Sequence, residues 1–522
     1  MFRSRAKIIT APVNNCSYRF ITRLLLSLMK TNARTDNSLR LDTIIIGSGF
    51  SGLCIAIKMQ QAGFSYTVLE QAASIGGTWR DNTYPGAACD VPSNLYCFSF
   101  APNPNWSRTY PQQAEIEKYM NDCADTFHIR KHIQLNKTVT CARFDTGRKL
   151  WRVEVNHGAE VFEAKTLLMG VGGLSRPQMP DIQGMESFTG ELFHTARWKH
   201  EVNLEGKRVG IIGTGASAIQ IVPEIADRVR QLIVFQRTPP WLIFKPDFAI
   251  SNWHRRLRAK LPILQKTNRA YTYAWHESWA IAFTRFPAVL KIMQLVAKVF
   301  MYFNIRDRSL REKLKPNYVI GCKRVLLSNT YLPALTKANV SLITDSIECI
   351  TPIGIRTRDG CEHPLDIIIA STGFLAAEAG SPFPVYGLEN KELNQQWQSG
   401  PSAYLGTTVS GFPNFFIMTG PNTALGHNSM IYMIESQASY VMSAMKEIIQ
   451  SPDLAFDIPE QTQNFYNETL QKQLAKTVWN TGGCSSWYLA KNGLNTTLWP
   501  DFTFVYRYKT RRFDVEHYQR LV

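Results

Sequence analysis

The stretch that decides the fold is Asp42-Thr-Ile-Ile-Ile46, followed at once by Gly47-Ser-Gly-Phe-Ser-Gly52. The apolar run is typical of a buried strand, and the apolar periodicity that continues to about Gln61 predicts a helix. Gly63 is placed to end that helix, and residues 65–70 predict the next strand. A strand, a glycine-rich turn and a helix that opens at the turn are together typical of a dinucleotide site.

Each glycine of this turn has a physical role. The first allows the tight turn, the second lets a pyrophosphate approach the backbone, and the third lets helix and strand pack closely. The helix N-terminus then faces the phosphates with its partial positive charge, and the acidic residue at the end of the next strand can bind the ribose hydroxyls. The cofactor-binding residues expected here are Gly47, Gly49, Phe50, Ser51, Gly52 and Glu70.

A second unit of the same kind begins at Lys207-Arg-Val-Gly-Ile-Ile212, turns at Gly213-Thr-Gly-Ala-Ser-Ala218 and returns on Leu232-Ile-Val-Phe235. Its second strand ends in Gln236-Arg237-Thr238 and not in an acid. A guanidinium can bind a 2′-phosphate through two hydrogen bonds, which favours NADPH over NADH; the alternative is that Arg237 only covers the sheet edge. The expected cofactor-binding residues are Gly213, Gly215, Ala216, Ser217, Ala218, Arg237 and Thr238.

Two dinucleotide sites on one chain imply a flavin and a nicotinamide cofactor, and the cysteines restrict the route of the electrons. A disulfide reductase would carry two redox cysteines just after the first unit, where this chain has Gly76-Gly-Thr-Trp-Arg80. The ten cysteines include no CxxC pair, which disfavours a disulfide scaffold and a zinc site and indicates a reducing, cytoplasmic setting. Reaction of reduced flavin with oxygen is the route that remains.

Four further motifs follow one another along the chain. They are Gly77-Thr-Trp-Arg-Asp-Asn-Thr-Tyr-Pro-Gly-Ala-Ala-Cys-Asp90, Phe188-Thr-Gly-Glu-Leu-Phe-His-Thr-Ala-Arg-Trp-Lys199, Gly321-Cys-Lys-Arg-Val325 and Ser371-Thr-Gly-Phe374. In this order, over roughly residues 41–510, the chain resembles a class B flavoprotein monooxygenase, and most of all a Baeyer–Villiger monooxygenase. The second motif ends in Lys199 where that family usually has Pro or Asp, so a flavin-containing N- or S-oxygenating monooxygenase stays an alternative.

The resemblance implies a chemical cycle and cofactors. NADPH reduces FAD, the reduced flavin adds oxygen to give a C4a-peroxide, and the peroxide anion attacks an apolar ketone, which rearranges to an ester or lactone. An N- or S-oxygenating enzyme would use the protonated hydroperoxide instead. Residues 489–499 differ from the matching run of the well-known cyclic-ketone enzymes, so their substrate is not carried over.

The resemblance also assigns residues. Arg324 matches the family's catalytic arginine, which supplies a cation beside the peroxide, and Asp90 matches the carboxylate that positions it; the alternative is a purely structural ion pair. His194 and Trp198 lie on the linker between the domains, where a hinge role is expected and a buried, hydrogen-bonded histidine is the alternative. The remaining matches to cofactor-binding positions are Gly77, Thr78, Trp79, Asp90, Lys323 and Trp487.

The expected fold is α/β, with two Rossmann-like dinucleotide-binding domains, for FAD and NADP, and a helical insertion in the second. We expect the following segments: a basic extension over residues 1–40, the first part of the FAD domain over 41–175, a linker over 176–206, the first part of the NADP domain over 207–240, the helical insertion over 241–317, the second part of the NADP domain over 318–370, and the second part of the FAD domain with a C-terminal loop over 371–522.

The net charge of +17 is concentrated in two segments. Residues 1–40 hold eight Lys/Arg and one acid, and residues 241–317 hold fifteen and four. Neither carries a nucleic-acid signature, and both mix basic with large apolar residues, which suits an anionic membrane surface; solvated helix faces are the alternative. A membrane-surface flavoprotein that mainly oxidises NADPH is therefore a third reading. The Trp, Phe and Met positions between 275 and 304 are interpreted as helix core.

Overall fold

The computed structural model describes residues 41–375, 380–490 and 492–522, so the expectation for residues 1–40 lies outside the described part. The first predicted unit is confirmed as β1 (Leu41–Ile46), α2 (Phe50–Ala62) and β2 (Tyr66–Leu69). Gly63 ends α2 in the left-handed region at φ 76°, which a residue with a side chain rarely adopts. β1 pairs in parallel with β2, so the glycine turn lies at the carboxyl end of the strand.

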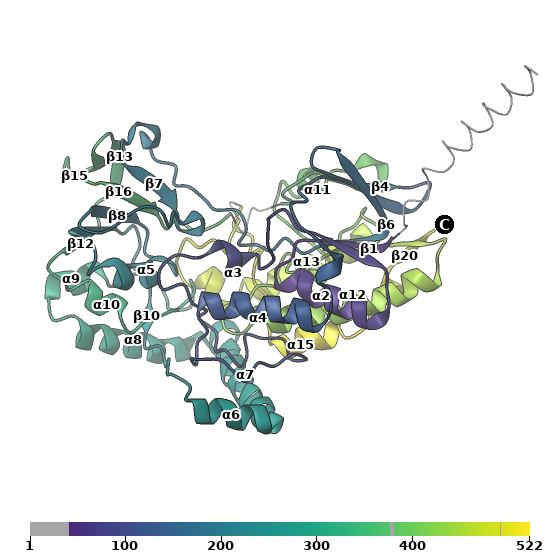
Figure 1. The fold of residues 1–522 in the computed structure, drawn as a ribbon, viewed down its shortest axis with the longest axis horizontal. Helices are drawn as coiled ribbons and strands as arrows, with labels where there is room; N and C mark the ends of the chain where they lie inside the picture. The colour runs from purple at the N-terminus through teal and green to yellow at the C-terminus, as the bar shows by residue number, and fades with distance from the viewer. Residues whose placement is uncertain (1–40, 376–379, 491) are drawn as a thin grey trace, which may run out of the picture. The chain divides into compact units, whose positions relative to one another are not determined.

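The first sheet has eight strands in the order β17-β4-β5-β6-β1-β2-β3, with β18 paired to β6 (Figure 1). β17 and β18 come after residue 371 and pair with β4 and β6, so the last part of the chain adds strands to the sheet of the first unit. The other strands of this sheet are β3 (Ile133–Gln134), β4 (Val139–Asp145), β5 (Leu150–Val155), β6 (Glu160–Met169), β17 (Val385–Tyr386) and β18 (Phe415–Ile417).

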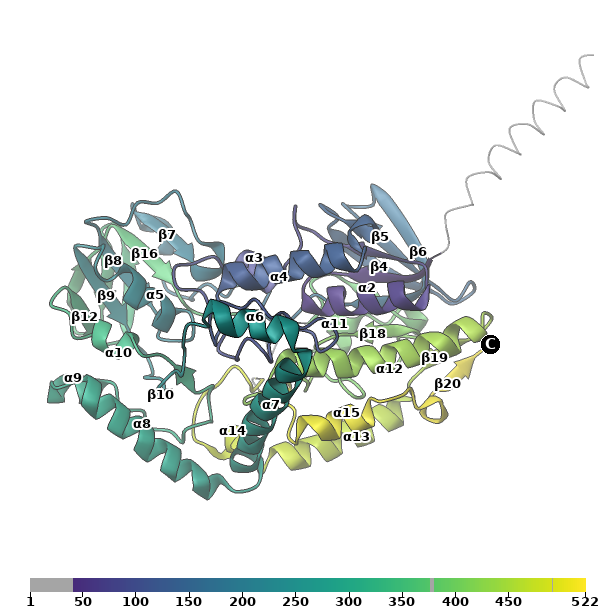
Figure 2. The ribbon, with the colours of Figure 1, turned by 60° about the horizontal axis from the view of Figure 1, so that its bottom comes forward.

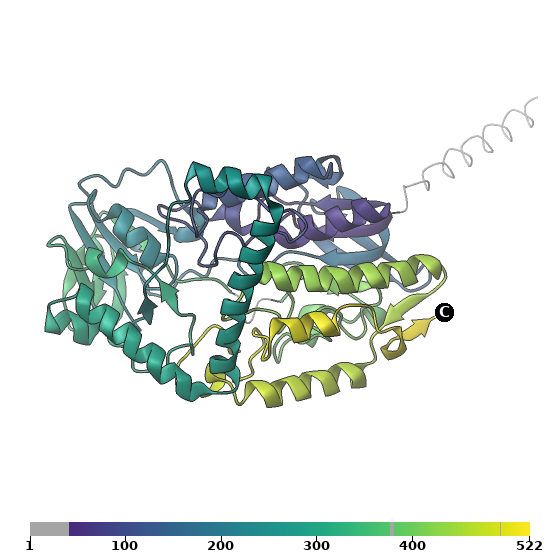
Figure 3. The same ribbon diagram turned by 90° about the horizontal axis from the view of Figure 1, so that it is seen from below.

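Helices close to each other in space, though distant in sequence, cover this sheet. α2 packs beside α12 (Met430–Gln450), which Figures 2 and 3 show running along the same side of the fold. Both helices contribute fully buried residues to one apolar core. The neighbouring elements are α3 (Thr78–Asp81), α4 (Gln113–Thr126), α11 (Leu393–Gln396), α13 (Glu460–Leu474), α14 (Val478–Thr481) and α15 (Thr503–Lys509), with a small hairpin of β19 (Ala455–Asp457) and β20 (Gln519–Leu521).

The second sheet has five parallel strands in the order β12-β9-β8-β16-β7. Its edge strand β7 comes from residues 191–194, which lie within the segment expected to be a linker. The members are β7 (Glu191–His194), β8 (Arg208–Ile212), β9 (Gln231–Phe235), β12 (Val340–Ile343) and β16 (Ile367–Ala370), with α5 (Ala218–Ile225) after β8 and α10 (Tyr331–Ala334) before β12. A three-stranded antiparallel sheet lies beside it: β13 (Ile347–Thr351), β14 (Gly354–Thr357) and β15 (Glu362–Pro364).

The predicted insertion is helical. It holds α6 (Asn252–Lys260), α7 (Pro262–Thr284), α8 (Leu290–Asn304) and α9 (Arg308–Lys313). The parallel pair β10 (Leu242–Ile243) and β11 (Leu326–Leu327) joins the two ends of the insertion. Among the described residues no single helix is long and apolar enough to cross a membrane, whereas α7 and the segment 287–304, bent by 107°, pass the same length and composition test together (Figure 2).

The interpretation of residues 275–304 as helix core is wrong for many of them. Trp275, Phe286, Tyr302 and Phe303 are between 56% and 80% exposed, while Phe283 is buried. The reason is that α8 is apolar around most of its circumference but packs against the fold on one face only.

Candidate active site

The first glycine turn forms a cradle of bare backbone. A Cβ on Gly52 would lie 1.9 Å from the Gly47 carbonyl oxygen, so the helix can approach the strand only with glycine there. Gly77 has φ +52°, and a Cβ on it would lie 3.1 Å from the Gly49 Cα. The loop that contains Gly77, Thr78 and Trp79 therefore closes directly over the turn, as a site for a pyrophosphate requires.

Glu70 is buried at the end of β2 and faces the turn. Its carboxylate accepts hydrogen bonds from the Ser48 backbone N–H at 2.9 Å and from the Ser48 hydroxyl at 2.7 Å. Arg80 donates to the other oxygen at 3.0 Å. The predicted ribose-binding acid is thus held in place by the turn itself and by the loop above it.

The Tyr84-Pro-Gly86 segment joins the two dinucleotide units. A Cβ on Gly86 would lie 2.7 Å from the Gln220 carbonyl oxygen, so this loop rests on the backbone of α5. The Tyr84 hydroxyl donates to the Gln220 side chain at 3.1 Å, and that side chain donates to the Ala88 carbonyl at 2.9 Å. This contact positions Asp90, at the end of the same motif, beside the second unit.

The second glycine turn is more open. Gly213 has φ +112°, and a Cβ on it would lie 2.4 Å from the Ser371 carbonyl oxygen. A residue with a side chain would not fit here, because the ends of β8 and β16 pack closely together. A Cβ on Gly215 would meet nothing within 4 Å, so space for a ligand remains over the N-terminus of α5. The turn continues through Ala216 and Ser217 into the buried Ala218, and the Thr214 hydroxyl donates to the Thr238 carbonyl at 3.1 Å.

Two basic side chains lie together beside this turn. Arg237 is exposed just after β9, and Lys323 is half-buried. Burial, and then the like charge of Arg237, lower the pKa of Lys323. Within the described part of the chain neither side chain has an acidic partner in an ion pair. Two neighbouring cations without a counter-charge form a site that favours a dianionic phosphate.

Arg324 and Asp90 form a bidentate ion pair although 234 residues separate them. The Arg324 Nη2 donates to Asp90 Oδ1 at 2.7 Å and its Nε donates to Oδ2, while Nη1 donates to the Leu425 carbonyl at 3.2 Å. Burial opposes ionisation of both groups, but their mutual attraction outweighs it, so the pKa of Asp90 is lowered and the pKa of Arg324 is raised. Both side chains remain about 30% exposed, so the fixed cation can still be reached.

A disulfide between Cys322 and Cys484 ties the loop before Arg324 to the C-terminal segment. Sequence reasoning did not predict this pairing: the two residues are 162 positions apart, and the cysteine content indicated reduced thiols. The tether is supported by a hydrogen bond from the Val319 N–H to the Gly482 carbonyl at 3.0 Å. Cys89, next to Asp90, is buried, and burial raises its pKa.

Several polar groups that sequence reasoning missed lie close to Arg324. The Tyr488 hydroxyl is buried and has no hydrogen-bond partner among the described residues. Burial raises the pKa of Tyr488 to about 12, although the charge of Arg324 acts in the opposite direction. His427 is fully buried with Nε2 3.7 Å from Glu277 Oε2, and its carbonyl bonds to His276 Nδ1 at 3.1 Å. Their sequence signal is weak, because single Tyr and His residues in helices and loops usually pack in cores.

The remaining predicted residues are less central. His194 is buried and its Nδ1 accepts from the Ala196 N–H at 3.0 Å, while its ring lies edge-on to Phe374, with the ring centres 5.8 Å apart. Burial lowers the pKa of His194. Trp198 packs edge-on against Phe193, and Trp487 is 46% exposed. His194 is thus buried with one ring nitrogen hydrogen-bonded, and the hinge role expected for it stays a prediction.

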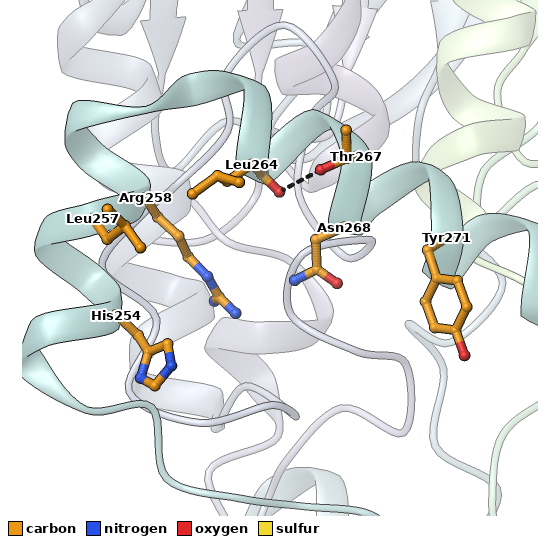
Figure 4. Close-up of a pocket in the computed structure, with 7 residues that line it drawn as sticks. All are labelled: His254, Leu257, Arg258, Leu264, Thr267, Asn268 and Tyr271. Atoms are coloured by element: carbon orange, nitrogen blue, oxygen red, sulfur yellow. Dashed lines mark hydrogen bonds between the residues drawn. The ribbon is translucent and has the colours of Figure 1, made fainter.

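A hollow of about 440 Å³ is lined by side chains of α6 and α7 (Figure 4). It contains no predicted site residue, so we do not count it as part of the active site. The lining side chains come from both helices: His254, Leu257, Arg258, Leu264, Thr267, Asn268 and Tyr271.

Comparisons with known proteins agree with this geometry. Residues 41–251 match the family model described as flavin-binding monooxygenase-like. A Baeyer–Villiger monooxygenase of Pseudomonas aeruginosa is 44% identical over 91% of this chain and 90% of its own length, and one of Streptomyces coelicolor is 44% identical over 91% and 92%. The crystal structure of OTEMO in complex with FAD and NADP is 28% identical, with a TM-score of 0.83 over 92% of this chain and 99% of that one.

Proposed function

The chain belongs to the flavin-binding monooxygenase-like family and is a Baeyer–Villiger monooxygenase. From this premise we propose that its substrate is an apolar ketone, that Arg324 is its catalytic residue and that Asp90 positions Arg324. It inserts one oxygen atom of O2 beside the ketone carbonyl, which gives an ester or lactone. The observation that carries the proposal is the bidentate ion pair of Arg324 and Asp90.

The enzyme uses FAD and NADPH. We assign FAD to the first turn, because Gly49 and Gly77 approach each other there with bare backbone and Gly52 lets α2 pack closely against the turn. In this assignment Glu70 binds the ribose hydroxyls, and the N-terminus of α2, which holds Phe50 and Ser51, faces the pyrophosphate. When bound, FAD reduced by NADPH supplies, together with O2, the oxygen atom that is inserted.

NADPH is assigned to the second turn. Gly215 leaves room over the N-terminus of α5, and Arg237, Thr238 and Lys323 lie where the 2′-phosphate of the adenosine end would be bound. Trp487 is expected to cover the cofactor from the C-terminal segment, which the disulfide holds near Arg324. The partly exposed indole of Trp487 is consistent with a surface that becomes buried only against a ligand.

The role of Arg324 follows from electrostatics. Attack on a ketone carbonyl requires a negatively charged oxidant, and an anion in a site that excludes water is strongly disfavoured without a cation beside it. Arg324 is always charged, and Asp90 fixes the plane of its guanidinium through two hydrogen bonds. Asp90 is itself an anion and cannot stabilise a negatively charged oxidant, so its role is to position the guanidinium. Arg324 carries the positive charge and is therefore the catalytic residue.

The variants Arg324→Ala and Asp90→Asn test this assignment. Both should bind FAD and allow its anaerobic reduction by NADPH, because neither residue belongs to the two glycine turns. Arg324→Ala should form no ester from a ketone and should release the consumed oxygen as hydrogen peroxide. Asp90→Asn should retain ester formation at a lower rate. An unchanged ester yield from Arg324→Ala would refute the catalytic role.

A further inference from the structure

The outer face of α8 carries an apolar stripe that nothing in the described fold covers. Ile292, Leu295, Val296, Val299 and Phe303 are between 45% and 80% exposed. Their spacing of three and four residues places them on one side of the helix. Figures 2 and 3 show α8 at the outside of the fold. Scattered exposed apolar residues are ordinary, but a continuous stripe along a whole helix marks an interaction surface.

The opposite face of α8 packs against the fold. Leu290 and Ala297 on that face are buried, and Ala297 joins the core cluster that contains Phe283 of α7. One face of α8 is therefore already packed against the fold. This excludes a partner that would have to surround the helix. Only a partner that meets one extended face fits this arrangement.

The charges around the stripe point to the kind of partner. Residues 278–306 contain no Asp or Glu and four basic residues. Lys291 and Lys298 lie one heptad apart along the same edge of the stripe, are exposed, and have no acidic partner within the described residues, whereas Arg285 is paired with Asp501 at 3.2 Å. Long basic side chains at the edge of an apolar face can reach phosphates while their stems stay in the apolar layer.

The bend between α7 and α8 extends the same surface. Phe286 is 61% exposed and Val289 is 47% exposed in the turn that joins the two helices at 107°. Trp275 and Tyr271 are exposed on α7 with helical spacing, and such aromatic side chains favour the interface between lipid headgroups and acyl chains. No part of the pair has to cross a bilayer for these groups to insert.

We propose that the bent helix pair α7–α8 docks on an anionic lipid surface, with the stripe of α8 and the Phe286 turn inserted in the outer acyl layer and Lys291 and Lys298 at the headgroups. The docking surface consists of residues of the insertion and is separate from the catalytic pair. It gives a specific location to the membrane contact that the basic composition alone suggested.

The inner side of the same helix pair touches the site, which gives the docking a purpose that rests on the proposed function. Phe283 lies against Gly321, where a Cβ would come within 2.7 Å of its ring, and Gly321 begins the loop that ends in Arg324. Phe283 also lies edge-on to the buried His427, with 6.4 Å between ring centres. An apolar ketone dissolved in the lipid would therefore enter at the helix pair that borders the site.

Vesicle flotation tests the docking, and it needs no catalysis. The full chain with FAD should float with vesicles of mixed phosphatidylcholine and phosphatidylserine, and less with phosphatidylcholine alone. The triple variant Ile292→Gln, Leu295→Gln, Val299→Gln should lower the partition coefficient by about tenfold or more, because Gln keeps the helix but removes the apolar side chains. Lys291→Gln with Lys298→Gln should reduce binding to the level seen on phosphatidylcholine alone.

Matched controls lie on α13. Phe465 is 73% exposed and Lys472 is exposed, so Phe465→Gln and Lys472→Gln remove the same kinds of group elsewhere and should leave flotation unchanged. The thermal unfolding midpoint of each variant reports whether it is folded. Equal flotation of the triple variant and the wild type would overturn the proposal. A wild-type dimer that the triple variant converts to a monomer, with neither bound to vesicles, would overturn it in favour of a contact between two copies.

A separate kinetic arm tests the purpose of the docking. Vesicles should lower the KM for a long-chain ketone in the wild type but not in the triple variant, and should not change the KM for a short, water-soluble ketone. If the proteins float as expected but no ketone is oxidised, the proposed function fails and the docking stands. If ketones are oxidised but nothing floats, the docking fails and the proposed function stands.

Discussion

The size of the preference for NADPH over NADH can be estimated from the contacts of two side chains. Arg237 and Lys323 lie beside the second glycine turn, and the like charge of Arg237 contributes to the lowered pKa of Lys323. NADPH differs from NADH only in the 2′-phosphate, so the loss of either cation should affect NADPH alone. A hydrogen bond to a charged group contributes about 1.5–3 kcal/mol, which is roughly a 10- to 150-fold change in kcat/KM.

The exposure of each side chain determines how large a loss of kcat/KM its removal should cause. Arg237 is exposed, so water and salt screen its contact, and Arg237→Ala should lower kcat/KM for NADPH by about tenfold. Lys323 is half-buried and less screened, so Lys323→Ala should cost closer to 100-fold. Removing Arg237 should also raise the pKa of Lys323, because a like charge has gone.

The assay is steady-state oxidation of NADPH and of NADH by the same preparations. Values for NADH should change by less than about twofold in either variant. Arg230→Ala is the matched control, because Arg230 is an exposed arginine at the opposite end of β9 and should affect neither cofactor. Equal losses for NADPH and NADH, or a loss in Arg230→Ala as large as in Arg237→Ala, would refute the assignment of the 2′-phosphate site.

Three further predictions follow from individual contacts. Gly52→Ala places a Cβ 1.9 Å from the Gly47 carbonyl oxygen and should abolish FAD retention, measured as the flavin-to-protein absorbance ratio; a fully loaded variant would contradict the packing argument. Cys484→Ser should lower the thermal unfolding midpoint and raise the share of NADPH oxidation that ends as hydrogen peroxide, because it removes a tether across 162 residues; identical values with and without the disulfide would exclude that role. Burial raises the pKa of Asp457 to about 6, so its protonated form stabilises the fold below its ordinary pKa of 3.8 and this contribution is lost as the pH rises through about 6; Asp457→Asn should flatten that part of the curve of unfolding midpoint against pH.

The nucleotide-binding framework could be predicted because its determinants are local. A buried strand, a glycine turn and an acid or a base at the next strand end follow one another within a few residues, and β1, α2 and β2 begin and end near the predicted positions. Packing across the sheet then explains the glycines, since Gly52 meets Gly47 and Gly213 meets Ser371.

Other features could not be predicted because they depend on which parts of the chain meet. Asp90 and Arg324 are 234 residues apart, and only the family resemblance indicated their pairing. Nothing in the spacing of Cys322 and Cys484 signals a disulfide. The exposed stripe was missed for a different reason: periodicity identifies an apolar helix but not the side on which the fold covers it, so residues such as Phe303 were assigned to the core.

The most direct test of the central claim is the fate of labelled oxygen gas. The purified enzyme with FAD and NADPH would be given linear, cyclic and aryl ketones, a sulfide and a tertiary amine, and the products would be analysed by mass spectrometry. The account predicts an ester or lactone that carries one labelled oxygen atom and is absent with Arg324→Ala. Labelled sulfoxide or N-oxide alone, with every ketone returned intact, would contradict it.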